Sequence, residues 1–274
     1  MTFGLAASEI HVKLPTEAIF HVGSFPITNA MILGAVGVTL MLLALGYAAY
    51  MVKNGRYNRF VGLISWAVEG MYGVVLEIVP DRKVAKSIAP LALTIFFTVL
   101  ATYWCAVLPG VGSMTVDGKE LLRELPSDLN FTFALAIIAM VTVQYYAIRA
   151  HGVFGNAGRY IKNPLKDPIG AFEGLLELIG EFSRLVALSL RLFGNAFAGA
   201  VLLLIVGILS GWLAALSLPF VMLFELFIGF IQAYVFFVLT IIFTSLAIAG
   251  HGDSHSSAHS SADTRTPAGD GSTS

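Results

Sequence analysis

Charged side chains are scarce in this sequence. Only 12% of its 274 residues are Asp, Glu, Lys or Arg, whereas hydrophobic residues make up 57%. Soluble domains carry about 25% charged residues, so the composition excludes an ordinary soluble protein and indicates an integral membrane protein. The formal net charge of −1 also argues against a nucleic-acid partner.

Cysteine is almost missing as well. The single one, Cys105, excludes a disulfide bond within the chain, and it lies in an apolar run. The N-terminal residues lack a basic region followed by an apolar core, so we expect no cleavable signal peptide. No residue pattern predicts a cofactor. His251, His255 and His259 have a spacing that could hold a metal ion, but we interpret them as part of a solvated tail.

Long apolar runs predict membrane-spanning helices. The first covers about residues 29–52, the second about 88–108 and the third about 131–148. A transmembrane helix needs about 20 such residues. Between the first two runs, apolar residues recur at helical spacing over 60–79 with two glutamates among them. This pattern predicts an amphipathic helix lying at the membrane interface.

Lys and Arg are concentrated in three connecting segments, 53–59, 80–87 and 149–167. The positive-inside rule places such segments in the cytoplasm. All three can share one side only if the amphipathic segment does not cross the membrane. The N-terminal segment 1–28 and the acidic loop 110–128 are then expected outside the cell.

Proline is missing from residues 169–249 except for Pro219. A helix over 169–210 would be about 60 Å long and one over 219–249 about 45 Å. Both exceed an upright crossing of a hydrocarbon layer about 30 Å thick. Hydropathy leaves two explanations open, short spans with unrecognised breaks or long helices that are strongly tilted. The Ser- and Gly-rich tail 250–274 is predicted to be disordered and cytoplasmic.

Arg191 is the only charged residue between Arg184 and the end of the apolar stretch at 209. A charge at bilayer depth costs about 2.5–3.5 kcal/mol, and a guanidinium cannot lose its proton in a protein. Four further polar residues lie within about 40° of Arg191 on a helical wheel: Glu173, Glu177, Arg184 and Asn195. Small residues on or beside this face would let another helix approach closely: Gly180, Ala187, Gly194 and Ala198. We therefore predict a contact surface that carries a fixed cation.

The last apolar stretch has a polar face of its own, along which Glu225, Gly229, Gln232 and Phe236 lie. A carboxylate can take up a proton, and an amide can relay hydrogen bonds. Glu225 and Gln232 are therefore predicted stations of a proton or cation path.

Structural interpretations compete with these functional ones. Arg191 could extend to the membrane interface, or it could pair with Glu225 inside the chain. Glu173 and Glu177 lie near a helix start, where acidic residues suit the helix dipole. Asp128 is interpreted first as the N-cap of the third span, and a place in the proton path is the alternative.

The string S-L-R-L-F-G-N-A-F-A-G, residues 189–199, resembles the signature of subunit a of F-type ATP synthases. I-A-P-L-A-L-T-I-F at 88–96 is similar to the second span of that family, and L-P-S-D-L-N at 125–130 is similar to the entry to its third. The resemblance covers about residues 29–249.

This resemblance implies an all-α integral membrane fold. One upright span, an interfacial amphipathic helix and a transmembrane hairpin would occupy 29–168, and two long tilted helices over 169–249 would pack against a ring of c subunits. The other implied partners are the peripheral stalk of subunit b, the catalytic head indirectly, and the lipid bilayer. The implied location is the bacterial cell (inner) membrane, with the N-terminus outside and the C-terminus in the cytoplasm.

The resemblance also implies a mechanism in which the chain has no catalytic site of its own. Arg191 would separate two half-channels and interact with each ionised carboxylate of the c-ring. Protons would enter past Glu225 and Gln232 and leave past Glu173 and Glu177.

The polar positions of the family are matched in part. Glu177, Asn195 and Gln232 match them, and Glu225 lies where other members have histidine or an acid. The sequence departs from the family at Ala200, where Glu or His is common, and at Tyr103, where asparagine is usual.

Two alternative functions from other classes are considered. One is a stand-alone ion channel or secondary transporter, and the other is a non-conducting anchoring subunit. Transporters often contain internal repeats, and none is found in this sequence. An anchoring subunit would have no need for a lone arginine on a face of small residues.

Overall fold

The computed structural model describes residues 18–22, 25–108, 111, 115–116, 119–120, 123–160 and 168–249. The predicted tail 250–274 and most of the N-terminal segment 1–28 lie outside these residues, so the predictions for them stay untested.

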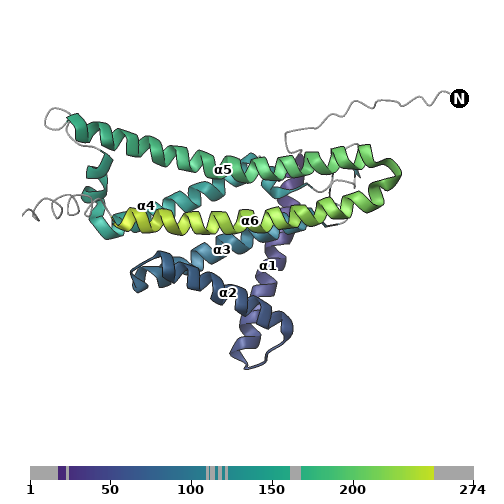
Figure 1. The fold of residues 1–274 in the computed structure, drawn as a ribbon, viewed down its shortest axis with the longest axis horizontal. Helices are drawn as coiled ribbons and strands as arrows, with labels where there is room; N and C mark the ends of the chain where they lie inside the picture. Colours follow the sequence, from purple (N-terminus) through teal and green to yellow (C-terminus); the bar gives the residue numbers. More distant parts are fainter. Residues whose placement is uncertain are drawn as a thin grey trace, which may run out of the picture.

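Six long helices make up nearly all of the described chain (Figure 1). They are α1 (Asn29–Lys53), α2 (Arg59–Ile78), α3 (Arg82–Ala106), α4 (Leu129–Tyr160), α5 (Pro168–Ser210) and α6 (Ala214–Ala249). Within the described residues, five stretches are long and apolar enough to cross a membrane, the last of them being the whole of 168–249. The prediction of an all-helical multi-pass membrane protein is confirmed.

Short elements complete the structure. β1 (Ala18–Val22) pairs with β2 (Phe25–Thr28), and β3 (Thr115–Val116) pairs with β4 (Lys119–Glu120), both antiparallel. Two turns of 3-10 helix follow, η1 (Leu125–Ser127) before α4 and η2 (Gly211–Leu213) between α5 and α6. The strands were not predicted, because such short runs cannot show an alternating pattern.

α3 begins earlier than predicted. The apolar run starts only at about residue 88, but Oδ1 of Asp81 accepts a hydrogen bond from the backbone N–H of Lys83 at 2.8 Å and caps the helix. Arg82, Lys83 and Lys86 therefore lie in the first turns of α3 and not in a loop. A capping side chain, and not hydropathy, sets this helix start.

The start of α4 agrees with the prediction for Asp128. Its Oδ1 accepts a hydrogen bond from the backbone N–H of Asn130 at 2.9 Å, so the N-cap interpretation is confirmed.

The end of α4 differs from the prediction of a loop over 149–167. The helix continues to Tyr160 across a break at Gly152, where φ is 75° and ψ is 164°. Glycine adopts this conformation without steric cost, so the chain changes direction and then resumes helical structure.

The two long helices are continuous. α5 has 43 residues and α6 has 36, which correspond to about 65 Å and 54 Å. The explanation by short spans with breaks is therefore wrong. Pro219 lies inside α6 and not at its start, because the helix begins at Ala214. In Figure 1, α5 and α6 run side by side and α1 lies across their direction.

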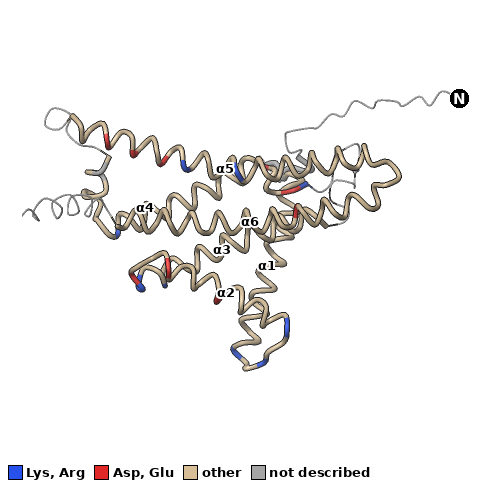
Figure 2. Tube along the Cα trace, viewed as in Figure 1, with Lys and Arg blue, Asp and Glu red and all other residues tan. Residues whose placement is uncertain are grey.

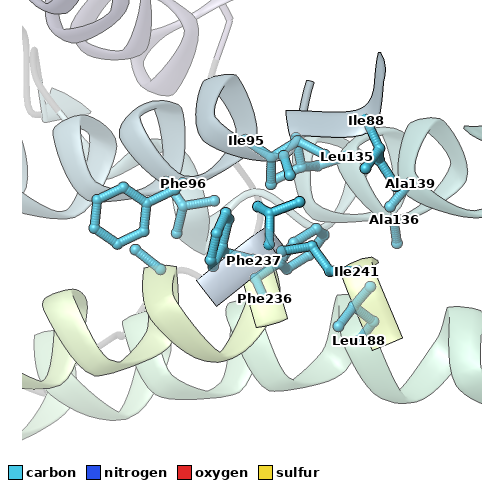
Figure 3. Close-up of a cluster of buried hydrophobic side chains, with 14 of the residues drawn as sticks. Ile88, Ile95, Phe96, Leu135, Ala136, Ala139, Leu188, Phe236, Phe237 and Ile241 are labelled. Carbon is cyan, nitrogen blue, oxygen red and sulfur yellow. The ribbon is translucent and has the colours of Figure 1, made fainter. Parts of the chain in front are cut away.

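A cluster of buried apolar side chains joins α3, α4, α5 and α6 (Figure 3). Its centre is aromatic, since the rings of Phe96 and Phe237 meet at 6.0 Å between centroids with an edge-on geometry. Leu188 and Leu192 extend from α5 into this cluster. One side of α5 is thus fixed by packing, and the side that carries Arg191 faces outward.

Candidate functional site

Charge on α5 is confined to the part of the helix up to Arg191, and the rest of the helix is uncharged (Figure 2). On α6 the only charged residue is Glu225. The site is therefore built from few ionisable groups on two adjacent helices.

Arg191 lies on the exposed face of α5. The neighbouring Leu188 and Leu192 are 2% and 0% exposed, whereas the arginine is exposed. Among the described residues it makes no hydrogen bond and no ion pair. The structural interpretation in which Arg191 pairs with Glu225 inside the chain is therefore wrong.

The face around Arg191 is open, as the sequence predicts. Glu173, Arg184 and Asn195 are also exposed, and Glu177 is half-buried. The small residues Ala187, Gly194 and Ala198 are exposed as well. A Cβ added at Gly180 or Gly194 would meet no other atom within 4 Å. The buried residues of this part of α5 lie to one side of Arg191, at about 60° to 160° from it on the helical wheel: Leu188, Ser189, Leu192 and Ala196.

Arg184 differs from Arg191 because it has a contact inside the chain. Its guanidinium carbon lies 5.1 Å from the centroid of the Phe243 ring on α6. A cation over an aromatic face is attracted by the ring quadrupole. Only one of the two arginines of α5 is thus left without a partner in the described structure.

Asn195 and Gln232 are brought together as one pair. Nδ2 of Asn195 on α5 donates a hydrogen bond to Oε1 of Gln232 on α6 at 2.7 Å. Gln232 is 3% exposed, and its Nε2 has no hydrogen-bond partner among the described residues. The pair joins the two long helices about one helical turn beyond Arg191.

Glu225 lies in a close-fitting buried position. It is 7% exposed, and its Oε2 has no hydrogen-bond partner among the described residues. Its Oε1 packs against Gly199, where a Cβ would lie only 2.5 Å away. The predicted face of α6 is confirmed, because Glu225, Gly229, Gln232 and Phe236 are all buried.

Three predicted residues remain, two on α5 and one at the start of α4. Glu173 and Glu177 precede it on α5 by 18 and 14 positions, or about 27 and 21 Å along the helix. Asp128 is buried at the start of α4. No group of three metal-ligating side chains occurs among the residues with described positions.

Tyr103 on α3 was not predicted to belong to the site and is known from the sequence only as a departure from the family pattern. Its hydroxyl donates a hydrogen bond to the backbone carbonyl of Leu192, the residue after Arg191, at 2.6 Å. Its Cβ lies only 2.7 Å from where a side chain would begin at Gly229 on α6. A buried tyrosine hydroxyl usually needs a hydrogen-bond partner, so a tyrosine inside the apolar run 88–108 is the sequence signal for this contact.

Known proteins match this chain over most of its length. The model of the ATP synthase A chain family matches residues 30–245. ATP synthase subunit a 2 of Vibrio campbellii is 33% identical over 224 residues, which cover 77% of this chain and 84% of that protein. ATP synthase subunit a of Mycobacterium marinum is 28% identical over 257 residues, covering 93% of this chain and 100% of the relative. A stripe of polar residues surrounds one arginine that has no partner among the described residues, and the family model matches most of the chain. The chain therefore belongs to the ATP synthase A chain family.

Proposed function

We propose that this chain forms two proton half-channels where it meets the c-ring and that Arg191 separates them. As a member of its family it is the proton-channel stator subunit of the Fo sector and not the catalytic subunit. The observation that carries the proposal for the site is Arg191 itself. It is an exposed guanidinium without a partner among the described residues, near the middle of a 43-residue apolar helix.

The partner of Arg191 is an ionised carboxylate on a passing c subunit. At about 4 Å such a pair attracts with roughly 4 kcal/mol at an effective dielectric constant near 20. This attraction favours the ionised carboxylate and so promotes release of its proton. It is also weak enough for the ring to move on when the next carboxylate arrives.

The outer half-channel contains Glu225, Gln232 and Asn195. Two observations support this assignment. Glu225 and Gln232 are buried, and each has a polar atom without a hydrogen-bond partner among the described residues. Buried polar atoms that lack hydrogen bonds are costly, and hydrogen bonds to water molecules along a proton path would satisfy both of them. Asp128 belongs to the same half-channel in this proposal, in addition to capping α4.

The inner half-channel contains Glu177 and Glu173 on the other side of Arg191 along α5. The basic residues at 53–59 and in the first turns of α3 support a cytoplasmic location for this side. In this orientation the chain lies in the bacterial cell (inner) membrane with its N-terminus outside the cell and its C-terminus in the cytoplasm.

The arrangement of the helices supports two long tilted helices. α1 lies across α5 and α6 in Figure 1, so an upright α1 requires the long helices to be strongly tilted. α2 has only Val61 and Val75 fully buried, as expected for a helix at the interface. The partners are the c-ring, the stalk of subunit b and, indirectly, the catalytic head.

A cross-linking experiment tests the partner. Ala187 is exposed on the face of Arg191, whereas Ala196 is 1% exposed on the packed face. Each is replaced by cysteine in a Cys105→Ala background, with a second cysteine beside the carboxylate of subunit c. After oxidation we expect a cross-linked a–c product from Ala187→Cys and none from Ala196→Cys. No product from Ala187→Cys, or equal yields from both variants, would contradict the proposal.

A further inference from the structure

A polar cluster joins α4 to α5 at a distance from Arg191. Glu181 lies on α5, half-buried, ten positions before the arginine, or about 15 Å along the helix. One of its carboxylate oxygens accepts a hydrogen bond from Nε2 of Gln144, and the other accepts one from the hydroxyl of Tyr160. Hydrogen bonds to an ionised acceptor are about twice as strong as neutral ones.

Gln144 connects the cluster to a third residue of α4, Asn156. Its Nε2 also donates to the Tyr160 hydroxyl at 2.9 Å, and its Oε1 accepts a hydrogen bond from Nδ2 of Asn156 at 3.1 Å. Asn156 is 6% exposed. These four residues, Gln144, Asn156, Tyr160 and Glu181, form what we name the Glu181 clamp.

The clamp holds the part of α4 that follows the break at Gly152. Asn156 and Tyr160 lie after the break, and His151 lies directly before it. Nε2 of His151 is 3.2 Å from the backbone carbonyl of Ala247, near the end of α6. The end of α4 therefore bridges α6 and α5.

This bridge closes the open end of the pair of long helices. At the other end, the short turn η2 joins α5 and α6 through the backbone. In Figure 1 the last part of α4 runs between the ends of α5 and α6 that are far from this turn. The position of α5, and of Arg191 on it, is thus fixed at both ends.

We propose that the Glu181 clamp positions α5, so that Arg191 meets the rotor carboxylate at the correct distance. Glu181 is a positioning residue, because it faces α4 at about 80° from Arg191 on the helical wheel. The attraction between two charges falls with their separation, so a small displacement of α5 weakens each exchange. This inference rests on the proposed function of Arg191.

The first test compares two tyrosines of α4 in the complete ATP synthase in membrane vesicles. Tyr160→Phe removes one donor from the clamp. Tyr145→Phe is the control, since Tyr145 is 57% exposed and its hydroxyl makes no hydrogen bond with described residues. ATP-driven acidification per ATP hydrolysed is measured at equal subunit abundance. We expect Tyr160→Phe to lower it about two- to tenfold, the worth of one hydrogen bond, and Tyr145→Phe to leave it unchanged. Equal values for both variants overturn the clamp.

The second test separates hydrogen bonding from charge. Glu181→Gln keeps an oxygen that can accept from Tyr160, whereas Glu181→Ala keeps none. We expect the glutamine variant to pump better than the alanine variant, and Glu181→Ala with Tyr160→Phe to be no worse than Glu181→Ala alone. The a–c cross-link from Ala187→Cys should fall in the same order. Additive losses, or a glutamine variant as defective as the alanine one, contradict the clamp.

The same assay distinguishes failure of the clamp from failure of the proposed function. If Arg191→Ala stops pumping and every clamp variant pumps normally, only the clamp is refuted. If Arg191→Ala pumps normally while the clamp variants are slow, the proposed role of Arg191 fails and the clamp is retained as a determinant of pumping.

Discussion

Glu225 is a buried acidic residue whose carboxyl group is not fully hydrogen-bonded within the described chain. A carboxylate that is 7% exposed, with one oxygen lacking a partner among the described residues, costs free energy. Its position on a helix that carries no other charge indicates that the cost is retained for a function. Ala200 stands where the family resemblance implies a common Glu or His, so in the proposed half-channel Glu225 would act without that second group.

Glu225→Gln tests its part in proton entry. The amide has the same shape but cannot release a proton, so we expect passive proton flux through the membrane sector to fall about tenfold or more. The flux is measured in vesicles after removal of the catalytic head, at equal amounts of the chain in the membrane. Flux at the unaltered level would count against the assignment.

Gly199→Ala tests the space beside this carboxylate. The new Cβ would lie 2.5 Å from Oε1 of Glu225, so the carboxyl group must move and we expect slower proton entry in the same flux assay. Gly207→Ala is the matched control, because its nearest contact would be an ordinary 3.8 Å to Leu218. Both variants gain about 1 kcal/mol of helix propensity, so equal flux in the two would show that the space is not needed.

At the scale of elements, α3 and α6 approach each other at Gly229. Tyr103 occupies the space in which a side chain of residue 229 would begin and reaches across to the carbonyl of Leu192 on α5. One side chain of α3 thus contacts both long helices, on α5 at the residue next to Arg191.

Gly229→Ala is expected to destabilise this contact. Its Cβ would lie 2.7 Å from Cβ of Tyr103, which is close to backbone and cannot move freely. Overpacking of this kind costs about 1–3 kcal/mol. Thermal unfolding of the purified complex should show a lower midpoint than for Gly46→Ala, where a Cβ meets nothing within 4 Å. An unchanged midpoint would mean that the helices separate without cost.

The sequence predicted the helices well and their ends less well, for physical reasons. Apolar runs set the middle of α1, α3 and α4. The start of α3 depends on one hydrogen bond to Asp81, and the bend of α4 depends on one backbone conformation at Gly152. A hydropathy pattern does not predict a single hydrogen bond or a single backbone conformation of this kind.

At the scale of the whole molecule, the separate polar faces of α5 and α6 were predictable from helical periodicity. The hydrogen bond between Asn195 and Gln232 was not predictable, because it depends on how α5 and α6 pack and joins residues 37 positions apart. The Glu181 clamp was missed for the same reason, since its members come from both sides of a break. The outward position of Arg191 depends on which side of α5 the other helices cover.

The central claim is that Arg191 exchanges partners on a moving ring and keeps the two half-channels apart. The most direct test is ATP-driven acidification by reconstituted complexes that contain Arg191→Ala. The account predicts that coupled proton transport is abolished, and that Arg191→Lys retains at most a trace because an ammonium differs from a guanidinium in shape and hydration. Normal acidification by the Arg191→Ala complex would contradict it.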